Sequence, residues 1–470
     1  MKNPRALLTL LGAVALAACS AAGDDDVGSQ EQNAQPIDRL LIGKAAAYPA
    51  DLTMRQRAPL FDASMAARRK TAWDVIARTV APVAIATTEP EPAGEIATNL
   101  TLPRFQTWHA REEILPMFDR LFRGLDETAR ARRAPFDAQA IEDVFPWNAT
   151  RATSLASFTQ ARLDQRRAEL ATPEGLASLG KDPRVLMSPD YVQHLFESYG
   201  KVLSCKPSDP IDPASGVVPT DPESPADFAP CLEGEFPPGA VAIKTRWMPS
   251  SAPVPVYDTS ASALRARLAE NGTFPEAGDT QADPTPAQAY TMQITPDART
   301  RLVALHIMTK ELRDWVWITM WWSPEPNSDF GADRPASLGG VWANYKMCVV
   351  TAYDEKDKLP GGGFPKTLAD ALDATNESGP ATWCSNPYLE TMEHGAKTNC
   401  IGCHQHGGTR ETSETLIANP DLFPDNTRKR VRRDFPVDYT FTTEGGLELA
   451  SEMRNRVEAI SPTPAPAPVR

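Results

Sequence analysis

The sequence has no hydrophobic run of the about 20 residues needed to cross a bilayer, which excludes a polytopic membrane protein. It has no excess of basic residues, because 48 Lys and Arg stand against 61 Asp and Glu, and the net charge is −13. We therefore expect no nucleic-acid partner. It also shows no Ser/His/Asp, phosphate-loop or dinucleotide signature. Chemistry has to be sought among seven cysteines and six histidines in 470 residues.

The first residues have the composition of an export signal. Lys2 and Arg5 precede an apolar stretch from Leu7 to Ala18, which ends in small residues before Cys19. This pattern resembles a bacterial lipoprotein signal, which implies cleavage after residue 18 and lipidation of Cys19. The alternative is an ordinary secretory signal that contains a cysteine. We expect residues 1–18 to be the signal, 19–38 an acidic tether, and the protein to be lipid-anchored on the periplasmic or outer-membrane face.

Residues 39–204 have a helical pattern. Trp73, Ile76 and Val80 recur at helical spacing, as do the apolar residues between Ile114 and Leu125. Ser188 followed by a proline predicts the start of another helix. A proline-rich loop follows over 205–231. The sequence thus predicts a helical N-terminal region.

The pattern then changes to alternation typical of β-strands. It predicts strands over 239–247, 301–308, 315–322 and 345–353, paired antiparallel because no crossover helix separates the last three. In the second strand, Ala304, His306 and Met308 share the face opposite an aliphatic stripe. We predict an α+β fold, in which the helical region precedes an antiparallel β-rich domain over 232–380. A C-terminal haem-binding segment over 381–460 and a disordered tail over 461–470 complete it.

One motif carries chemistry. Cys400, Cys403 and His404 form C-x-x-C-H, the attachment sequence of c-type haem. Two thiols on one helical turn can each add to a haem vinyl group, and the adjacent imidazole can then bind the iron as proximal ligand. The predicted cofactor is one covalent haem c. Export agrees with this, because such haem is attached on the exported side of the membrane.

Two other readings of the motif are weaker. Cys400, Cys403, His404 and His406 could form a zinc site, but adjacent ligands at 403 and 404 fit one tetrahedron poorly. A redox dithiol would need a thioredoxin-like context, which the surrounding pattern does not provide.

Four cysteines remain after lipid and haem attachment, and they allow three pairings. Local bracketing favours Cys205 with Cys231, across the proline-rich loop, and Cys348 with Cys384. The second bridge would tie the last strand to the segment that enters the haem motif.

The second axial ligand is open at this point. His306 is the first candidate, because a mid-strand imidazole facing away from an aliphatic stripe needs a partner. His406 is too close to His404 in the chain to reach the opposite side of a haem. The remaining candidates are Met392, Met453, His109, His194 and an open coordination position.

Several further stretches carry a family resemblance. They are 236–247, 305–310 with 315–317, 386–388 and 399–405. Together they resemble a loosely defined group of exported bacterial mono-haem c-type cytochrome lipoproteins, over residues 236–440. The resemblance implies haem and export but no substrate.

The expected function is electron transfer at the periplasm or outer membrane, with a redox partner protein that the acidic surface suggests is basic. The alternatives are a haem enzyme of oxidase or peroxidase type and a surface binding module in which haem is structural.

Overall fold

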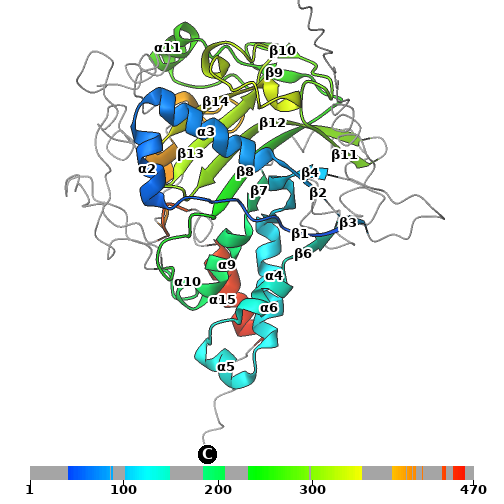
Figure 1. The fold of residues 1–470 in the computed structure, drawn as a ribbon, viewed down its shortest axis with the longest axis vertical. Helices are drawn as coiled ribbons and strands as arrows, with labels where there is room; N and C mark the ends of the chain where they lie inside the picture. Colours follow the sequence, from blue (N-terminus) through cyan, green and yellow to red (C-terminus); the bar gives the residue numbers. More distant parts are fainter. Residues whose placement is uncertain are drawn as a thin grey trace, which may run out of the picture.

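The computed structural model describes residues 41–84, 86–87, 101–148, 184–206, 231–295, 298–351, 384–397, 400–404, 406–408, 415, 437–440 and 448–460. The fold is α+β, as predicted, with helices and antiparallel sheets. In Figure 1, the central sheet occupies the upper half and a group of helices lies below it. The predicted signal, Cys19, the tether, most of the proline-rich loop and the tail lie outside the described residues.

The predicted N-terminal helices form where the sequence places them. They are α3 (Met65–Val80), α4 (Arg111–Gly124) and α9 (Pro189–Glu197). The helix α2 (Met54–Asp62) also lies in the region expected to be helical. Ser188 caps α9 by accepting a hydrogen bond from the Tyr191 backbone, and Ser64 caps α3 in the same way. The remaining helices of the described chain are α5 (Glu127–Arg132), α6 (Ala138–Asp143), α10 (Tyr199–Val202), α11 (Ala261–Glu270), α13 (Cys400–His404) and α15 (Glu448–Ile460).

The N-terminal region is less purely helical than its pattern indicates. Two of its strands, β5 (His109–Ala110) and β7 (Arg184–Met187), pair with each other, and β7 pairs with the main sheet. Strands of two to four residues are too short to show alternation, so periodicity could not reveal them. The other short strands are β1 (Leu41–Lys44), β2 (Pro82–Ala84), β3 (Ala86–Thr87), β4 (Thr101–Pro103), β6 (Pro146–Asn148), β9 (Val254–Val256) and β10 (Thr280–Ala282).

The central sheet is antiparallel throughout, in the order β14-β13-β12-β8-β7-β5, with β11 also pairing with β12. Four of its members confirm the predicted strands. They are β8 (Val241–Pro249), β12 (Ala298–Thr309), β13 (Val316–Trp322) and β14 (Tyr345–Val350). The strand β11 (Thr291–Thr295) was not predicted.

Trp315 departs from the predicted strand. It precedes β13 with a positive φ of 65° and does not continue the sheet face that Trp317 and Trp321 share. Its indole nitrogen instead donates a hydrogen bond to the backbone of Asp438, 2.9 Å away. The alternation of aromatic residues therefore predicted one residue too many for the strand.

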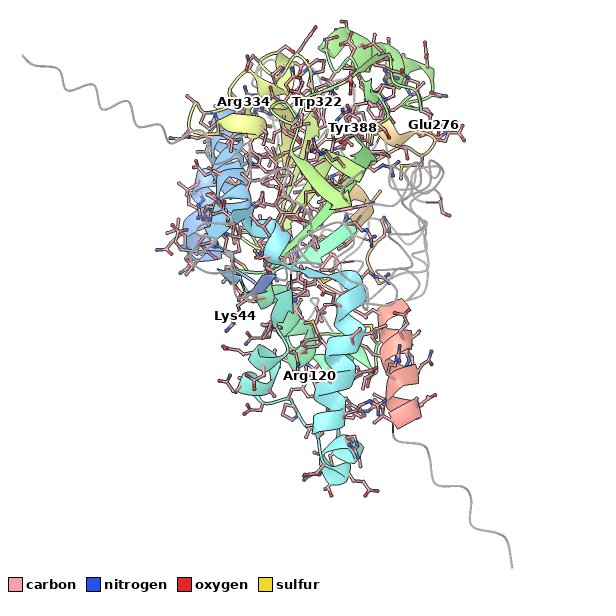
Figure 2. All side chains as sticks on the ribbon, turned by 90° about the vertical axis from the view of Figure 1, so that its right-hand side faces the viewer. Lys44, Arg120, Glu276, Trp322, Arg334 and Tyr388 are labelled. Carbon is pink, nitrogen blue, oxygen red and sulfur yellow. A yellow bond between two sulfur atoms is a disulfide. The ribbon has the colours of Figure 1, made fainter. Side chains whose placement is uncertain are left out.

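The helices below the sheet form their own packed group. In Figure 2, Arg120 marks α4 there, while Trp322, Tyr388 and Arg334 lie in the upper part. Arg456 of α15 pairs with Asp119 of α4 at 3.3 Å.

Among the residues described, no helix is both long and apolar enough to span a membrane.

Both predicted disulfides are present. Cys205 bonds Cys231 and Cys348 bonds Cys384. The first joins the two ends of the proline-rich loop, and the second links β14 to the chain that leads into the haem motif.

Candidate haem attachment site

Four residues form a row across one face of the central sheet. Lys244 of β8 pairs with His306 of β12, His306 pairs with Thr319 of β13, and Thr319 pairs with Cys348 of β14. Residues paired directly across antiparallel strands project from the same face, so the four side chains are neighbours. The opposite face of β8 is buried and carries Val241, Ile243 and Thr245. The polar row therefore lies on the face away from that core.

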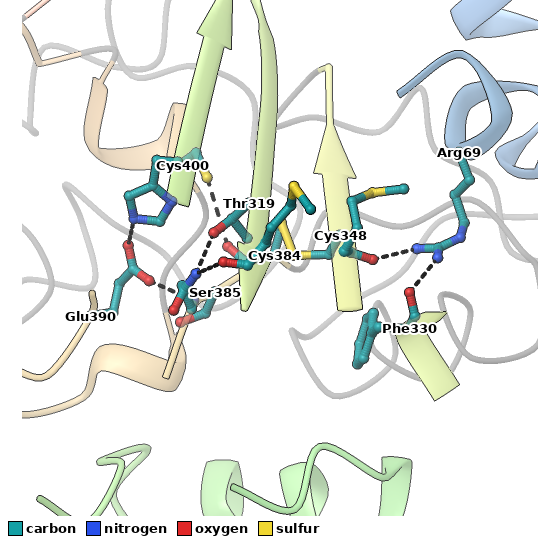
Figure 3. Close-up of a disulfide and its surroundings, with 12 residues drawn as sticks. Arg69, Thr319, Phe330, Cys348, Cys384, Ser385, Glu390 and Cys400 are labelled. Carbon is teal, nitrogen blue, oxygen red and sulfur yellow. Dashed lines mark hydrogen bonds and ion pairs between the residues drawn. A yellow bond between two sulfur atoms is a disulfide. The ribbon is translucent and has the colours of Figure 1, made fainter. Parts of the chain in front are cut away.

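The chain before the haem motif crosses this row in order (Figure 3). Cys384 bonds Cys348, and the Asn386 side-chain nitrogen donates to Thr319 Oγ1 at 2.6 Å. Glu390 Oε1 then lies 2.7 Å from His306 Nε2. Each contact is one strand further across the sheet, so the segment is held against β14, β13 and β12 in turn.

Asn386 and Glu390 also support each other. The Glu390 carboxylate accepts a hydrogen bond from the Asn386 backbone at 2.5 Å, and Asn386 is fully buried. Neither residue belongs to a chemical motif in the sequence, and only Asn386 lies in a stretch that carries the family resemblance. Their role becomes visible only when the sheet face is assembled beneath them.

The motif itself forms the short helix α13. Cys400 and Cys403 are thiols and not members of a disulfide. Cys400 Sγ lies 4.0 Å from the Cys384 carbonyl, next to the bridge. Burial raises the pKa of the Cys400 thiol well above its ordinary value, and the Glu390 carboxylate adds to this. Cys400, which is half-buried, thus keeps its proton.

His404 ends the helix with a fixed tautomer. Its Nδ1 lies 2.9 Å from the backbone carbonyl of Tyr439. A carbonyl only accepts, so Nδ1 must be the donor and the neutral ring carries its lone pair on Nε2. Burial lowers the pKa of His404 to about 3. Electrostatic interactions with His306 and Lys244 lower this pKa further, whereas the hydrogen bond to Tyr439 raises it. His404 is therefore neutral at physiological pH, the state in which an imidazole binds a metal.

The ring of His404 also contacts the sheet. The Trp317 ring centroid lies 4.3 Å away from that of His404, at an angle of 44°. Trp317 is 3% exposed, and its indole nitrogen donates to the Asp314 carbonyl at 2.9 Å. The indole therefore keeps its place beside the imidazole and shields that side of it from water.

The carbonyl that orients His404 belongs to a tight turn, residues 437–440. The Thr440 backbone donates to Val437 at 3.0 Å, and both central residues have positive φ, 47° for Asp438 and 64° for Tyr439. Left-handed backbone costs about 1–2 kcal/mol at each non-glycine residue. Such strain persists only where surrounding contacts impose it, and it concentrates at functional sites.

The turn fits closely against the haem motif. A Cβ added at Gly407 would lie 2.8 Å from the Thr440 carbonyl oxygen and 3.1 Å from Val437 Cγ2. Only glycine permits this approach. The backbone after His404 and the 437–440 turn are thereby held together.

The other predicted ligands lie in different parts of the fold. His306 lies beside it, with Nε2 on Glu390 and Nδ1 buried without a hydrogen bond to any described residue. Met453 is 1% exposed and is a core residue of α15. His109 is in β5, at the sheet edge opposite β14, against Phe145. The two others are Met392, partly exposed in the 384–397 segment, and His194, bonded to the Gly234 carbonyl at 3.2 Å.

The residues at the site fit a covalent haem. They supply two thiols and a neutral, oriented imidazole, with an aromatic wall from Trp317. Among the described residues, no group of three or more His, Cys, Asp or Glu has the geometry of a metal-ion site. Haem needs no such group from the protein, because its porphyrin supplies four iron ligands.

Comparison with known proteins adds no relative. No family model matches the chain, and the searches of curated proteins and of solved structures gave no match either.

Proposed function

We propose that this protein is a c-type cytochrome that carries one haem on Cys400 and Cys403, with His404 as proximal ligand, and that it transfers electrons. The haem would supply a reversible one-electron couple. The protein's own residues bind it, exclude water from it and orient the ligand. The proposal rests on C-x-x-C-H and on one structural observation in particular.

That observation is the hydrogen bond from His404 Nδ1 to the Tyr439 carbonyl. Histidines that bind metals almost always donate their second ring nitrogen to a carbonyl or carboxylate, which fixes the ring and makes the ligating nitrogen more basic. Here the bond leaves the lone pair on Nε2 of a histidine that directly follows two cysteine thiols in the motif. The same kind of bond holds His194 to the Gly234 carbonyl, so it supports a ligand role for His404 only together with the C-x-x-C-H motif.

We propose His306 as the second axial ligand. His306 Nε2 donates to Glu390, and Nδ1 makes no hydrogen bond within the described chain, so Nδ1 is the ring nitrogen available to bind iron. His306 is close enough to His404 for its charge to lower the pKa of that histidine, although burial is the larger cause. Two nitrogen ligands would give a low-spin iron suited to electron transfer.

We further propose that the protein is lipid-anchored through Cys19, on the periplasmic or outer-membrane face. The lipoprotein-like signal in the sequence supports this, and both disulfides suit an oxidising compartment. The net charge of −13 favours a basic redox partner.

The test removes both attachment thiols in the double variant Cys400→Ala, Cys403→Ala. The full-length wild-type chain, matured in a host that attaches haem c, should give a haem-stained band on a denaturing gel, and the variant should give none. The matched control is Cys205→Ala with Cys231→Ala, which also removes two cysteines and should keep the stain. A stained band from the first variant would contradict the proposal.

One observation favours a haem enzyme instead. The Glu390–His306 pair lies beside the haem motif, and a carboxylate–imidazole pair can transfer protons to a substrate. If Glu390 holds His306 away from the iron, the sixth position is open. Rapid cyanide binding by the wild-type ferric protein would favour this enzyme.

A further inference from the structure

A buried ion pair holds the turn that orients His404. Lys310 Nζ lies 2.7 Å from Asp438 Oδ1, and both side chains are fully buried. Lys310 is the residue directly after β12. Asp438 directly precedes Tyr439, whose carbonyl accepts the hydrogen bond from His404. The ion pair thus connects the central sheet to the proximal ligand through a single peptide unit.

Three further bonds fix the same residue. The Trp315 indole nitrogen donates to the Asp438 carbonyl at 2.9 Å and to Asp438 Oδ1 at 3.2 Å, and the Phe236 backbone donates to Asp438 Oδ2 at 3.1 Å. Tyr439 is held separately, because its hydroxyl donates to Asp314 Oδ1 at 3.3 Å. Every one of these partners belongs to the 236–315 part of the chain, far in sequence from the turn.

These contacts explain the backbone of the turn. Asp438 and Tyr439 both have positive φ, which a tyrosine does not adopt without external constraint. The contacts to Lys310, Trp315 and Phe236 supply that constraint. They direct the Tyr439 carbonyl at His404 Nδ1.

We propose that Asp438 and Lys310 are positioning residues that set the reduction potential of the haem, by holding the Tyr439 carbonyl on the proximal histidine. This inference rests on the proposed function. A strong hydrogen bond from Nδ1 makes the ligating nitrogen more basic and favours Fe(III). Loosening the turn weakens that bond and raises the reduction potential.

The signs of the shifts separate positioning from a simple charge effect. Asp438→Asn removes a negative charge, although Glu235 remains 3.7 Å from Lys310, and Lys310→Met removes a positive charge. A pure charge effect would therefore move the potential in opposite directions. Positioning moves it upward in both variants. Trp315→Phe changes no charge, removes both hydrogen bonds from the indole to Asp438, and should also raise the potential.

The chain offers a matched control. Buried Lys346 and half-buried Asp329 form another ion pair at 2.9 Å, which includes no residue of the turn. Asp329→Asn removes a similar ion pair and should destabilise the protein without changing the potential. This control separates the effect of removing any ion pair from the effect of removing the one that holds the 437–440 turn.

The experiment is a spectroelectrochemical titration of the haem-loaded full-length protein and these four variants. We expect the Fe(III) to Fe(II) ratio at a fixed ambient potential to fall by threefold to tenfold for Asp438→Asn and Lys310→Met, where tenfold corresponds to 59 mV. If Asp438→Asn fails to mature, the shifts in reduction potential of Lys310→Met and Trp315→Phe decide whether the inference holds. Opposite shifts for the two charged variants, or shifts no larger than that of Asp329→Asn, would overturn the inference while leaving the cytochrome proposal intact. A wild-type protein without haem would overturn both.

Discussion

Glu390 Oε1 lies 2.7 Å from Nε2 of His306, a residue in the middle of the central sheet. With the Cys348–Cys384 bridge and the Asn386–Thr319 hydrogen bond, this contact fixes the approach to the haem motif on three neighbouring strands. The segment that leads into C-x-x-C-H is therefore part of the sheet's packing. Perturbing any of the three contacts should affect the haem site as well as stability.

The Cys348–Cys384 bridge should matter to the haem more than the other bridge does. The separations of 36 and 26 residues give each disulfide about 3.5–4 kcal/mol of stabilisation in the chain-entropy model. Removing either pair should lower the melting temperature by a similar amount. Only Cys348→Ala with Cys384→Ala should also change the haem absorption spectrum. Equal spectra for the two double variants would contradict this role.

His306 should control the coordination of the iron. The variant His306→Ala should convert a six-coordinate, low-spin spectrum into a high-spin one that binds cyanide or CO rapidly. Met392→Leu and Met453→Leu are the controls for the methionine alternatives, and both should leave the spectrum unchanged. A low-spin spectrum that survives in His306→Ala but disappears in one of the methionine variants would assign the ligand to that methionine.

Asn386 should be costly to replace. Its amide nitrogen donates to Thr319 Oγ1 and to the Met320 carbonyl at 2.8 Å, and its oxygen accepts from the Tyr388 backbone at 3.0 Å. Asn386→Ala leaves these buried groups unsatisfied, and we expect a loss of about 1–3 kcal/mol in the free energy of unfolding. Thr319→Val breaks two hydrogen bonds, from Asn386 and to the Leu305 carbonyl at 3.1 Å, against three for Asn386→Ala, and should cost less. Denaturant unfolding followed by tryptophan fluorescence measures both, and equal losses would be unexpected.

His194 should make stability depend on pH. Burial lowers its pKa below 6.5, while the Gly234 hydrogen bond and the carboxylates of Asp438 and Glu197 oppose the shift and Lys310 supports it. The unfolded chain therefore binds a proton at a pH where the folded one does not, so stability is full above about pH 6.5 and falls as the pH drops towards the lowered pKa. His194→Gln can still donate to Gly234, and it should flatten this part of the curve. The free energy of unfolding is measured with denaturant at each pH between 7 and 5. If it falls equally steeply with pH in His194→Gln and in the wild type, the assignment is contradicted.

Much of the framework was predictable because it is local or periodic. Alternation placed His306 on the polar face of its strand, bracketing gave both disulfides, and Ser188 marked a helix start. The short strands β5 and β7 carry too few residues for a period. Trp315 was misplaced because its alternation with Trp317 continues past the point where the backbone turns.

The support around His404 could not be predicted in the same way. Tyr439 acts through its backbone, which has no sequence signature, and lies 35 residues from His404. Lys310 and Asp438 are 128 residues apart and meet only after the sheet has formed. Sequence spacing identifies the groups that react, whereas the residues that orient them come from the tertiary fold.

The central claim is that Cys400 and Cys403 hold a haem above His404, and peptide mass spectrometry of the matured protein tests it most directly. The account predicts that the proteolytic fragment containing residues 400–404 carries the added mass of one haem and absorbs visible light. A fragment of unmodified mass, from a colourless protein produced with a working haem-attachment system, would contradict it.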